Sequence, residues 1–366
     1  MFRLFPIVIL DFLLEIDCLT FTQLQQDDID KAAGILTSGG LVALPTETVY
    51  GLGADARQDD AVKRIFEVKG RPNFNPLIVH VPGLDLAQEI GEFDELSTQL
   101  AEKFWPGPLT IVVPLKKSAG ISETVTAGLS TIALRAPDHE LSQELLARSG
   151  IALAAPSANS SGRLSPTSAE HVRQDLGEKV DFILDGGETK RGLESTIVKA
   201  ELDYETGLPI LVLLRLGPVT ADELEAVLGV RVVCPEVAID ETQIKEKNDG
   251  STSSALPSSL PETLPIAPGA LLRHYAPKTS VRLEATEVLT GEGLLGFGPE
   301  DEGLESDVPF YNLSETGDLE EAAARLFAGL HWLDNQDVSG IAVRPIPFEG
   351  VGLAINDRLR RAANSS

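Results

Sequence analysis

The sequence alternates short apolar runs of strand character with amphipathic stretches of helical period, and this alternation restricts the fold most strongly. Such a pattern is typical of α/β domains, in which helices cover the faces of a sheet. The chain has 366 residues, of which 43% are hydrophobic, enough for about two domains of ordinary size. The runs predict strands at 41–44, 77–81, 109–115, 131–135, 151–155, 180–184, 195–199 and 210–214.

Three amphipathic stretches between these runs carry signals for the ends of helices. The stretch 59–70 has aspartates at its start and a glycine at its end. The stretches 167–177 and 220–229 each open with a threonine that a glutamate follows three residues later, and each closes with a glycine. These are the residues that cap helices at their N- and C-termini, so we predict a helix in each stretch.

The composition changes near residue 248 and divides the chain. The stretch 248–267 contains five Ser and three Pro without an apolar period, which indicates a linker. We therefore expect an α/β catalytic domain at 21–240, a linker at 241–277 and a smaller α/β domain at 278–366. The smaller domain is predicted to contain strands at 293–297 and 341–344 and helices at 319–333 and 352–363.

Residues 1–20 are expected to form an N-terminal extension. Their apolar run follows Arg3 but is broken by three acidic residues and has no Ala-x-Ala site, so a signal peptide is the less favoured alternative. Apolar runs stay shorter than the ~18 residues of a transmembrane helix, and we expect no membrane association. Cys18 and Cys234 show no metal or redox spacing, which favours a reducing, cytoplasmic location.

The net charge of −26 limits the classes of partner. Broad, nonspecific nucleic-acid binding depends on Lys and Arg that neutralise phosphates, and this composition argues against it. A local basic pocket is compatible with the same total. The five histidines form no zinc-binding spacing, so we expect no zinc site.

Polar clusters follow several predicted strands at their carboxyl ends. They read "PTET" after Leu44, "RAP" after Leu134 and "PSANSSGRLSPT" after Ala155, while "GLESTIV" places hydroxyls at the mouth of a fourth strand. Ligands of open α/β sheets bind outside the carboxyl ends of strands. Many hydroxyls and few ionisable groups predict a site that binds polar ligands by hydrogen bonds rather than one built on a protein nucleophile.

The few cations near these clusters each allow two interpretations. Lys69 and Arg71 in "KGRP" either complement the negative end of a helix or, with Arg71 held between a glycine and a proline, present a planar fork to phosphates. P-loop and Rossmann fingerprints are absent. His80 interrupts an apolar strand and is either a core group or a ligand contact. Arg135 ends a strand and needs an anion partner, from a protein carboxylate or from a ligand.

The order of these motifs resembles one family. It reads "PTETVYGLG … KGRP … NPLIVH … WPGPLT … TIALRAP … APSAN … SPT … ESTIV … LRLGPV … PGALLRHYAPK" and is similar to the YrdC-type threonylcarbamoyl-AMP synthases in their two-domain form. The resemblance implies a YrdC-like, twisted, mostly mixed sheet with helices, then a linker and a smaller Rossmann-like domain. It also implies that L-threonine, bicarbonate and ATP give L-threonylcarbamoyl-AMP and pyrophosphate, for threonylcarbamoyladenosine modification of tRNA beside the anticodon.

The resemblance further implies roles for individual residues. Lys69 and Arg71 are expected to carry catalysis by neutralising phosphate charge, with Mg²⁺ entering with ATP and no protein ligands to it identified. Contacts to L-threonine are expected from Thr48, His80, Arg135, Ala155 and Ser195. Contacts to ATP are expected from Lys69, Arg71, Asn75, Thr131, Ser157, Asn159, Ser165, Arg215 and Tyr275. Read alone, Ser165 is equally a helix cap and Asn159 a turn residue, and Tyr275 is expected to belong to a lid over the nucleotide.

Three alternatives compete with this interpretation, and the cysteine count excludes one of them. An RNA-binding module of the same fold is disfavoured by the net charge, although direct tRNA binding is left undecided. A carbamoyltransferase of the hydrogenase-maturation type would carry zinc-binding Cys clusters, which two isolated cysteines do not supply. A nucleotide-binding regulator without turnover is the third. For the enzyme, the expected recipient of the adenylate is a tRNA threonylcarbamoyl transferase complex.

Overall fold

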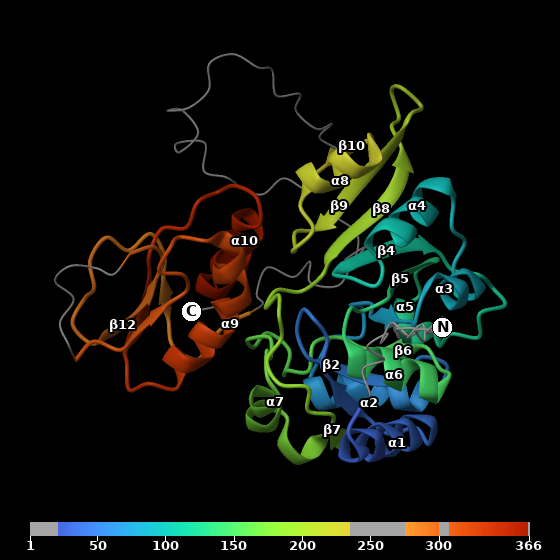
Figure 1. Ribbon diagram of the computed structural model, residues 1–366, viewed down its shortest axis with the longest axis horizontal. Helices are drawn as coiled ribbons and strands as arrows, with labels where there is room; N and C mark the ends of the chain where they lie inside the picture. The colour runs from blue at the N-terminus through green and yellow to red at the C-terminus, as the bar shows by residue number, and fades with distance from the viewer. Residues whose placement is uncertain (1–20, 235–274, 300–306, 365–366) are drawn as a thin grey trace, which may run out of the picture.

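A computed structural model describes residues 21–234, 275–299 and 307–364. The expected N-terminal extension and the linker before Tyr275 lie outside the described residues. Two sheets organise the described chain, one large and mixed, the other small and parallel (Figure 1). The predicted fold class is confirmed in these terms. Among the described helices, none combines the length and the apolar character needed to cross a bilayer.

The large sheet has ten strands in the order β10-β9-β8-β4-β5-β3-β6-β2-β1-β7. The sheet mixes parallel and antiparallel pairs: β3 is parallel to β5 and antiparallel to β6, for example. The eight predicted strands are confirmed, although several are shorter than expected. The bounds are β1 (Val42–Leu44), β2 (Gly51–Asp55), β3 (Ile78–His80), β4 (Leu109–Pro114), β5 (Thr131–Arg135), β6 (Leu153–Ala154), β7 (Phe182–Ile183), β8 (Thr196–Leu202), β9 (Pro209–Arg215) and β10 (Arg231–Val233).

Strand β2 was not expected, because "GLGAD" reads as a glycine-rich turn. It forms an antiparallel hairpin with β1, in the register Val42↔Gly53, and its other edge pairs with β6. Gly53 is needed at this crossing, since a Cβ there would lie 2.9 Å from Leu44 Cδ2. The "PTETVY" segment is therefore the loop of a hairpin inside the sheet.

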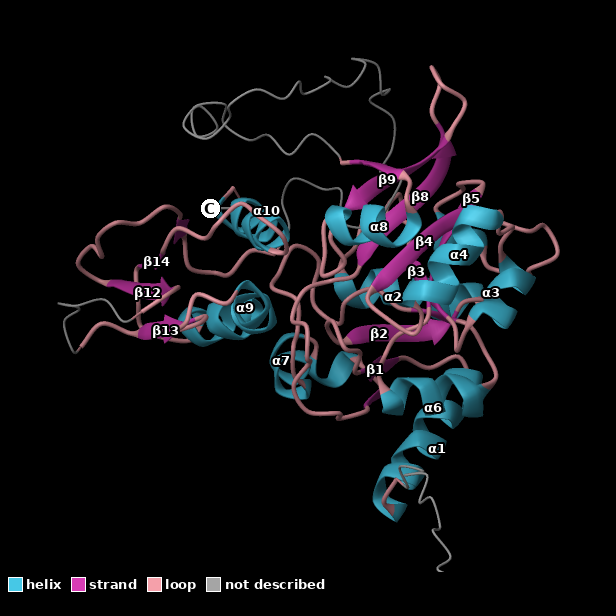
Figure 2. Cartoon of the chain, turned by 45° about the horizontal axis from the view of Figure 1, so that its top comes forward, coloured by secondary structure: helices cyan, strands magenta, loops and turns pink. Residues whose placement is uncertain are grey.

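Helices cover the large sheet on both faces (Figure 2). On one side, α1 and α6 bury Ile29, Leu36 and Leu145 against Leu44 of β1. The bounds are α1 (Gln23–Thr37), α2 (Asp59–Lys69), α3 (Leu84–Ile90), α4 (Glu95–Phe104), α5 (Glu123–Thr126), α6 (Glu140–Ser149), α7 (Ala169–Asp175), a 3₁₀ turn η1 (Gly177–Lys179) and α8 (Ala221–Leu228).

The predicted helix ends are partly right. Thr220 caps α8 by accepting a hydrogen bond from the Glu223 N–H. Gly70 ends α2 at φ 60°, but no aspartate caps its start, because Asp59 Oδ1 instead accepts hydrogen bonds from Ser122 and Thr124. The N-cap of α7 is Ser168 rather than Thr167, and the helix ends before the 3₁₀ turn.

The small sheet has the strand order β11-β14-β12-β13, and all of its pairs are parallel. Helices α9 and α10 lie between this sheet and the first domain (Figures 1 and 2). The elements predicted for this half are confirmed to within about two residues. The bounds are β11 (Val281–Arg282), β12 (Glu292–Gly296), β13 (Phe310–Asn312), α9 (Leu319–Asp334), β14 (Gly340–Val343) and α10 (Gly352–Ala363). A single buried apolar cluster includes residues of both sheets, so the two halves share a core.

Candidate active site

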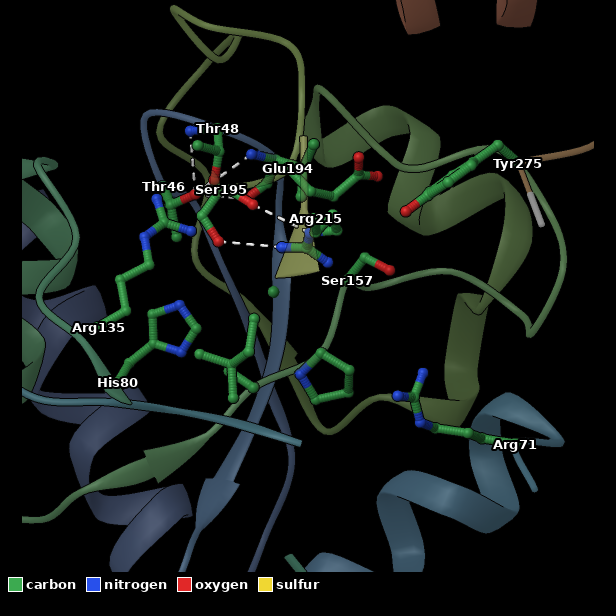
Figure 3. Close-up of a pocket in the computed structure, with 15 residues that line it drawn as sticks. Thr46, Thr48, Arg71, His80, Arg135, Ser157, Glu194, Ser195, Arg215 and Tyr275 are labelled. Carbon is green, nitrogen blue, oxygen red and sulfur yellow. Dashed lines mark hydrogen bonds between the residues drawn. The ribbon is translucent and has the colours of Figure 1, made fainter. Parts of the chain in front are cut away.

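A cavity opens where the polar loops of the large sheet converge (Figure 3). It has about 560 Å³ of empty space, part of which is open solvent. Three arginines and one glutamate line it, so it is locally positive in an acidic protein. The lining residues are Thr46, Thr48, Val49, Gly51, Arg71, Ile78, His80, Arg135, Ala155, Pro156, Ser157, Glu194, Ser195, Arg215 and Tyr275.

The β1–β2 loop supplies the buried hydroxyls of Thr46 and Thr48. Their oxygens are 2.7 Å apart, and Thr46 Oγ1 also donates to the Val49 carbonyl and accepts from the Thr48 and Val49 N–H groups. These bonds fix a tight turn at the mouth of the cavity. Gly51 follows, and a Cβ there would contact Ala155 at 3.4 Å, so this loop packs closely on the segment after β6.

Arg135 ends β5 beside His80, its register partner on β3. Nη2 of Arg135 lies 2.7 Å from Glu47 Oε1, with both side chains almost fully buried. The anion that a buried Arg135 requires is therefore a protein carboxylate, that of Glu47. Within the described chain, Glu47 Oε2 has no hydrogen-bond partner, so the pair keeps capacity for a further polar contact.

His80 is buried and its Nδ1 also lacks a hydrogen-bond partner among the described residues. Burial first, and the charge of Arg135 second, lower the pKa of His80 to about 3. The ring is therefore neutral near pH 7 and presents one donor and one acceptor. Its orientation in Figure 3 places it next to Arg135 on one wall of the cavity.

Ser195 precedes β8 and connects two strands across the cavity wall. Its hydroxyl lies 2.7 Å from Thr110 Oγ1 and accepts a hydrogen bond from Arg215 Nη2 at 3.0 Å. Arg215 also donates from Nε to the Ser195 carbonyl. Ser195 thus links Thr110 of β4 to Arg215 of β9.

Arg71 and Lys69 follow the end of α2 but differ in position. Arg71 lines the cavity and donates to the Asn75 and Pro76 carbonyls, at 3.3 and 3.0 Å; burial lowers its pKa to about 10, so it remains charged at pH 7. Lys69, expected to face phosphates, does not line the cavity. Its Nζ donates to the Ser157 and Asn159 carbonyls, and burial lowers its pKa well below the ordinary value.

Four other expected residues also lie outside the cavity lining. Thr131 lines a second, smaller cavity with Ile132 and Ala133. Asn159 donates to the Ser160 and Arg163 carbonyls, as a turn residue does. Asn75 is buried, with its Oδ1 unpartnered among the described residues, and Ser165 is buried with its hydroxyl donating to Glu194.

Tyr275 closes the side of the cavity that faces the smaller domain. Its side chain is buried, and its hydroxyl points toward Arg215 and Ser157 in Figure 3. The following residue, Ala276, donates to the Gly162 carbonyl at 2.8 Å. The start of the second half of the chain is thus anchored on the loop after β6.

Comparison with known proteins identifies the family to which the chain is related. Residues 34–213 match the Sua5/YciO/YrdC family, described as telomere recombination, and residues 219–364 match the C-terminal domain of threonylcarbamoyl-AMP synthase. The threonylcarbamoyl-AMP synthases of Pyrococcus abyssi and Bacillus subtilis are 40% and 39% identical to this chain, over 93% and 92% of it and 95% and 92% of their own lengths. The chain belongs to the threonylcarbamoyl-AMP synthase family. A crystal structure of P. abyssi Sua5 complexed with L-threonine matches it with a TM-score of 0.72 and 36% identity, over 92% of this chain and 94% of that one.

In this member of the threonylcarbamoyl-AMP synthase family, three charged side chains in or near the site received no role from the sequence. Glu47 and Glu194 stand inside the quoted motifs "PTET" and "GLESTIV". A carboxylate among buried hydroxyls requires a cation, and that requirement could have drawn attention to both. Arg358 gave no such signal, because a run of arginines near the end of the last helix is what a helix C-terminus favours.

Proposed function

We propose that the protein synthesises L-threonylcarbamoyl-AMP and pyrophosphate from L-threonine, bicarbonate and ATP, as a nucleotidyltransferase. The observation that carries the proposal is the cavity itself, where three arginines and several hydroxyls converge in a chain 40% identical to a threonylcarbamoyl-AMP synthase. Anionic substrates need this local positive charge, because the protein as a whole carries −26.

The reaction depends on the positioning of its substrates more than on a protein nucleophile. The threonine ammonium group gives up a proton, the resulting amine forms a C–N bond to the carbon of bicarbonate, water leaves, and a carbamate results. A carbamate oxygen then attacks the α-phosphorus of ATP, and the bond to pyrophosphate breaks. Holding the carbamate and the nucleotide in line, with phosphate charge neutralised, accounts for catalysis of this type.

The wall formed by Thr48, His80, Arg135, Ala155 and Ser195 is proposed to hold threonine. Arg135 would receive the carboxylate, sharing its charge with Glu47, while the neutral His80 and the hydroxyls would bind the amine and the side-chain hydroxyl. A site that hydrogen-bonds a hydroxyl discriminates against analogues that lack it by up to ~10⁴. Serine should therefore replace threonine far better than valine does.

The opposite wall is proposed to hold ATP, with Arg71, Ser157, Arg215 and Tyr275 in contact and Asn75, Thr131, Asn159 and Ser165 in support. Lys69 takes a positioning role here, since it fixes the 157–159 loop through two carbonyls. The described residues do not fit a resident metal site, because no group of three or more His, Cys, Asp or Glu side chains is placed to hold an ion. Mg²⁺ belongs to the proposal only as part of the magnesium–nucleotide substrate.

The wider context is proposed on the same basis. The adenylate would pass to a tRNA threonylcarbamoyl transferase complex in the cytoplasm. The division into residues 1–20, 21–240, 241–277 and 278–366 stays a prediction, which limited proteolysis can test.

The test of the function is threonine-dependent release of pyrophosphate from ATP in bicarbonate buffer, with the adenylate identified by mass spectrometry. Omission of threonine or bicarbonate should abolish both products. Threonine-independent ATP hydrolysis, or ATP binding without turnover, would contradict the proposal.

A further inference from the structure

Arg358 of α10 belongs to the smaller domain, yet its side chain is buried against the first domain. It is 1% exposed, and its Nε donates to Glu194 Oε2 at 2.8 Å across 164 residues of sequence. Its Nη2 donates to the Leu216 carbonyl at 2.8 Å. Asp357, the neighbouring residue, accepts from the third guanidinium nitrogen at 2.6 Å. All three nitrogens are thus used, and two of them hold the first domain.

The partners of Arg358 are adjacent to the cavity. Glu194 lines the cavity, and its other carboxylate oxygen accepts a hydrogen bond from the Ser165 hydroxyl. Leu216 directly follows Arg215, which also lines the cavity. The guanidinium carbon of Arg358 lies 5.0 Å from the centroid of the Tyr275 ring, within the range of a cation–π contact.

The charges explain why this arrangement matters for an anionic ligand. Burial by itself raises the pKa of Glu194, but the charges of Arg358 and Arg215 bring it below the ordinary value, so Glu194 is a buried carboxylate. Without Arg358, the Glu194 carboxylate would be neutralised by Arg215 alone, and its remaining negative charge would repel phosphates. With Arg358 in place, Arg215 keeps its bonds to Ser195 and its charge toward the cavity.

Helix α9 supports Tyr275 from the same domain. The rings of Tyr275 and Phe327 have centroids 5.6 Å apart. Tyr275 is therefore held by α9 on one side and by Arg358 of α10 on the other, with its hydroxyl directed into the cavity (Figure 3). The smaller domain sets the position of a wall of the site, and its contribution is more than the attachment of a linker.

We propose that Arg358 is a positioning residue through which the smaller domain shapes the nucleotide side of the active site, by neutralising Glu194 and fixing the backbone after Arg215. The inference rests on the proposed function in one respect, the placement of ATP against Arg71, Ser157, Arg215 and Tyr275. It assigns no contact between Arg358 and substrate.

The experiment compares four full-length variants with the wild type. Arg358→Met removes the cation, Arg358→Lys keeps the charge but loses the forked geometry, and Glu194→Gln/Arg358→Met removes both charges. Glu320→Gln is the matched control, because it breaks the exposed interdomain pair with Arg191, whose atoms are 3.3 Å apart. The readouts are the Kd of a non-hydrolysable ATP analogue by calorimetry, KM for ATP and for threonine separately, and the melting temperature.

We expect Arg358→Met to raise the Kd of the analogue and KM for ATP at least tenfold, with KM for threonine changed less than threefold. Arg358→Lys and the double variant should lie between Arg358→Met and wild type, and both serve if Arg358→Met does not fold. Glu320→Gln should bind the analogue like wild type. A melting temperature that falls while the Kd stays at the wild-type value would reduce Arg358 to a structural contact between domains and overturn the inference.

Two further outcomes separate this inference from the proposed function. Wild type that binds the analogue but releases no threonine-dependent pyrophosphate would reject the function, and the Kd series would still decide the role of Arg358. Equal losses toward ATP and threonine, or no binding of the analogue by wild type, would overturn the inference itself.

Discussion

Arg135 and Glu47 form the buried ion pair on the proposed threonine wall, and we expect single and double replacements of the pair to differ in stability. The two charged groups are 2.7 Å apart and their side chains are 4% and 3% exposed. At an effective dielectric constant of ~20, their attraction is about 6 kcal/mol. Desolvation offsets most of this gain, so the intact pair contributes little net stability, but one partner left alone in the interior costs about 3–5 kcal/mol.

Arg135→Gln should therefore lower the free energy of unfolding by about 3–5 kcal/mol, a large share of the about 5–15 kcal/mol typical of a domain. Glu47→Gln/Arg135→Gln should recover most of that loss, because no buried charge remains unpaired. Threonine binding should be lost in both variants, since both lack the proposed partner of the substrate carboxylate.

Urea unfolding in a Trp332→Phe background provides the measurement, because the chain has two tryptophans and Trp105 then reports on the first domain alone. Trp105 donates from Nε1 to the Leu109 carbonyl at 2.7 Å, so its fluorescence follows the large sheet. Calorimetry gives the affinity for threonine. Arg173→Gln, which breaks an exposed pair with Asp185, is the control and should change stability by less than ~1 kcal/mol. Additive losses in the double variant, or a double variant that binds threonine like wild type, would refute the reasoning.

Three further predictions concern other residues of the site. Arg71→Ala should raise KM for ATP about 10- to 100-fold, as expected from losing charge-assisted hydrogen bonds of ~1.5–3 kcal/mol; near-normal ATP affinity in steady-state kinetics would return Arg71 to a helix-end role. Lys69→Met leaves the buried Asn159 carbonyl without its donor and removes one of two donors to the Ser157 carbonyl, which should cost about 1–3 kcal/mol in a denaturation experiment, whereas unchanged stability would mean that the 157–159 loop does not depend on it. His80 has a pKa of about 3 in the folded protein against ~6.5 when unfolded. Between these two pH values, His80 binds a proton in the unfolded chain but not in the folded protein. Stability should fall by about 1.4 kcal/mol per pH unit as the pH drops through this window, and the pH dependence of unfolding should be shallower in His80→Gln; identical slopes would disprove this origin.

The sequence was a good guide to elements with a regular apolar pattern and a poor guide to pairing between distant residues. Strands such as β4 and β5 were predictable because β-branched and leucine side chains fill both of their buried faces. Strand β2 was not, since its Gly53 owes its presence to close packing on Leu44. The choice of partner for Arg135 or Arg358 depends on residues 88 to 164 positions away, and no local pattern records it.

The lysine after α2 shows the same limit within the site. Its place in "KGRP" suggested a phosphate contact, but the left-handed turn at Gly70 separates the directions of Lys69 and Arg71. Arg71 reaches the cavity and Lys69 turns under the 157–159 loop. Two cations separated by one residue thus occupy different positions, one at the cavity and one against the carbonyls of Ser157 and Asn159.

The order of the strands in the large sheet has a kinetic consequence. The Leu41 N–H beside β1 bonds to Asp181 beside β7, 140 residues away, and the cavity walls come from eight separate segments between Thr46 and Tyr275. Contacts of such long range form late, because each must first overcome the entropy of closing a long loop. A partly folded chain would thus have helices and hairpins but no assembled cavity. Nucleotide chemistry would begin only after the large sheet has closed and α10 has docked on Glu194.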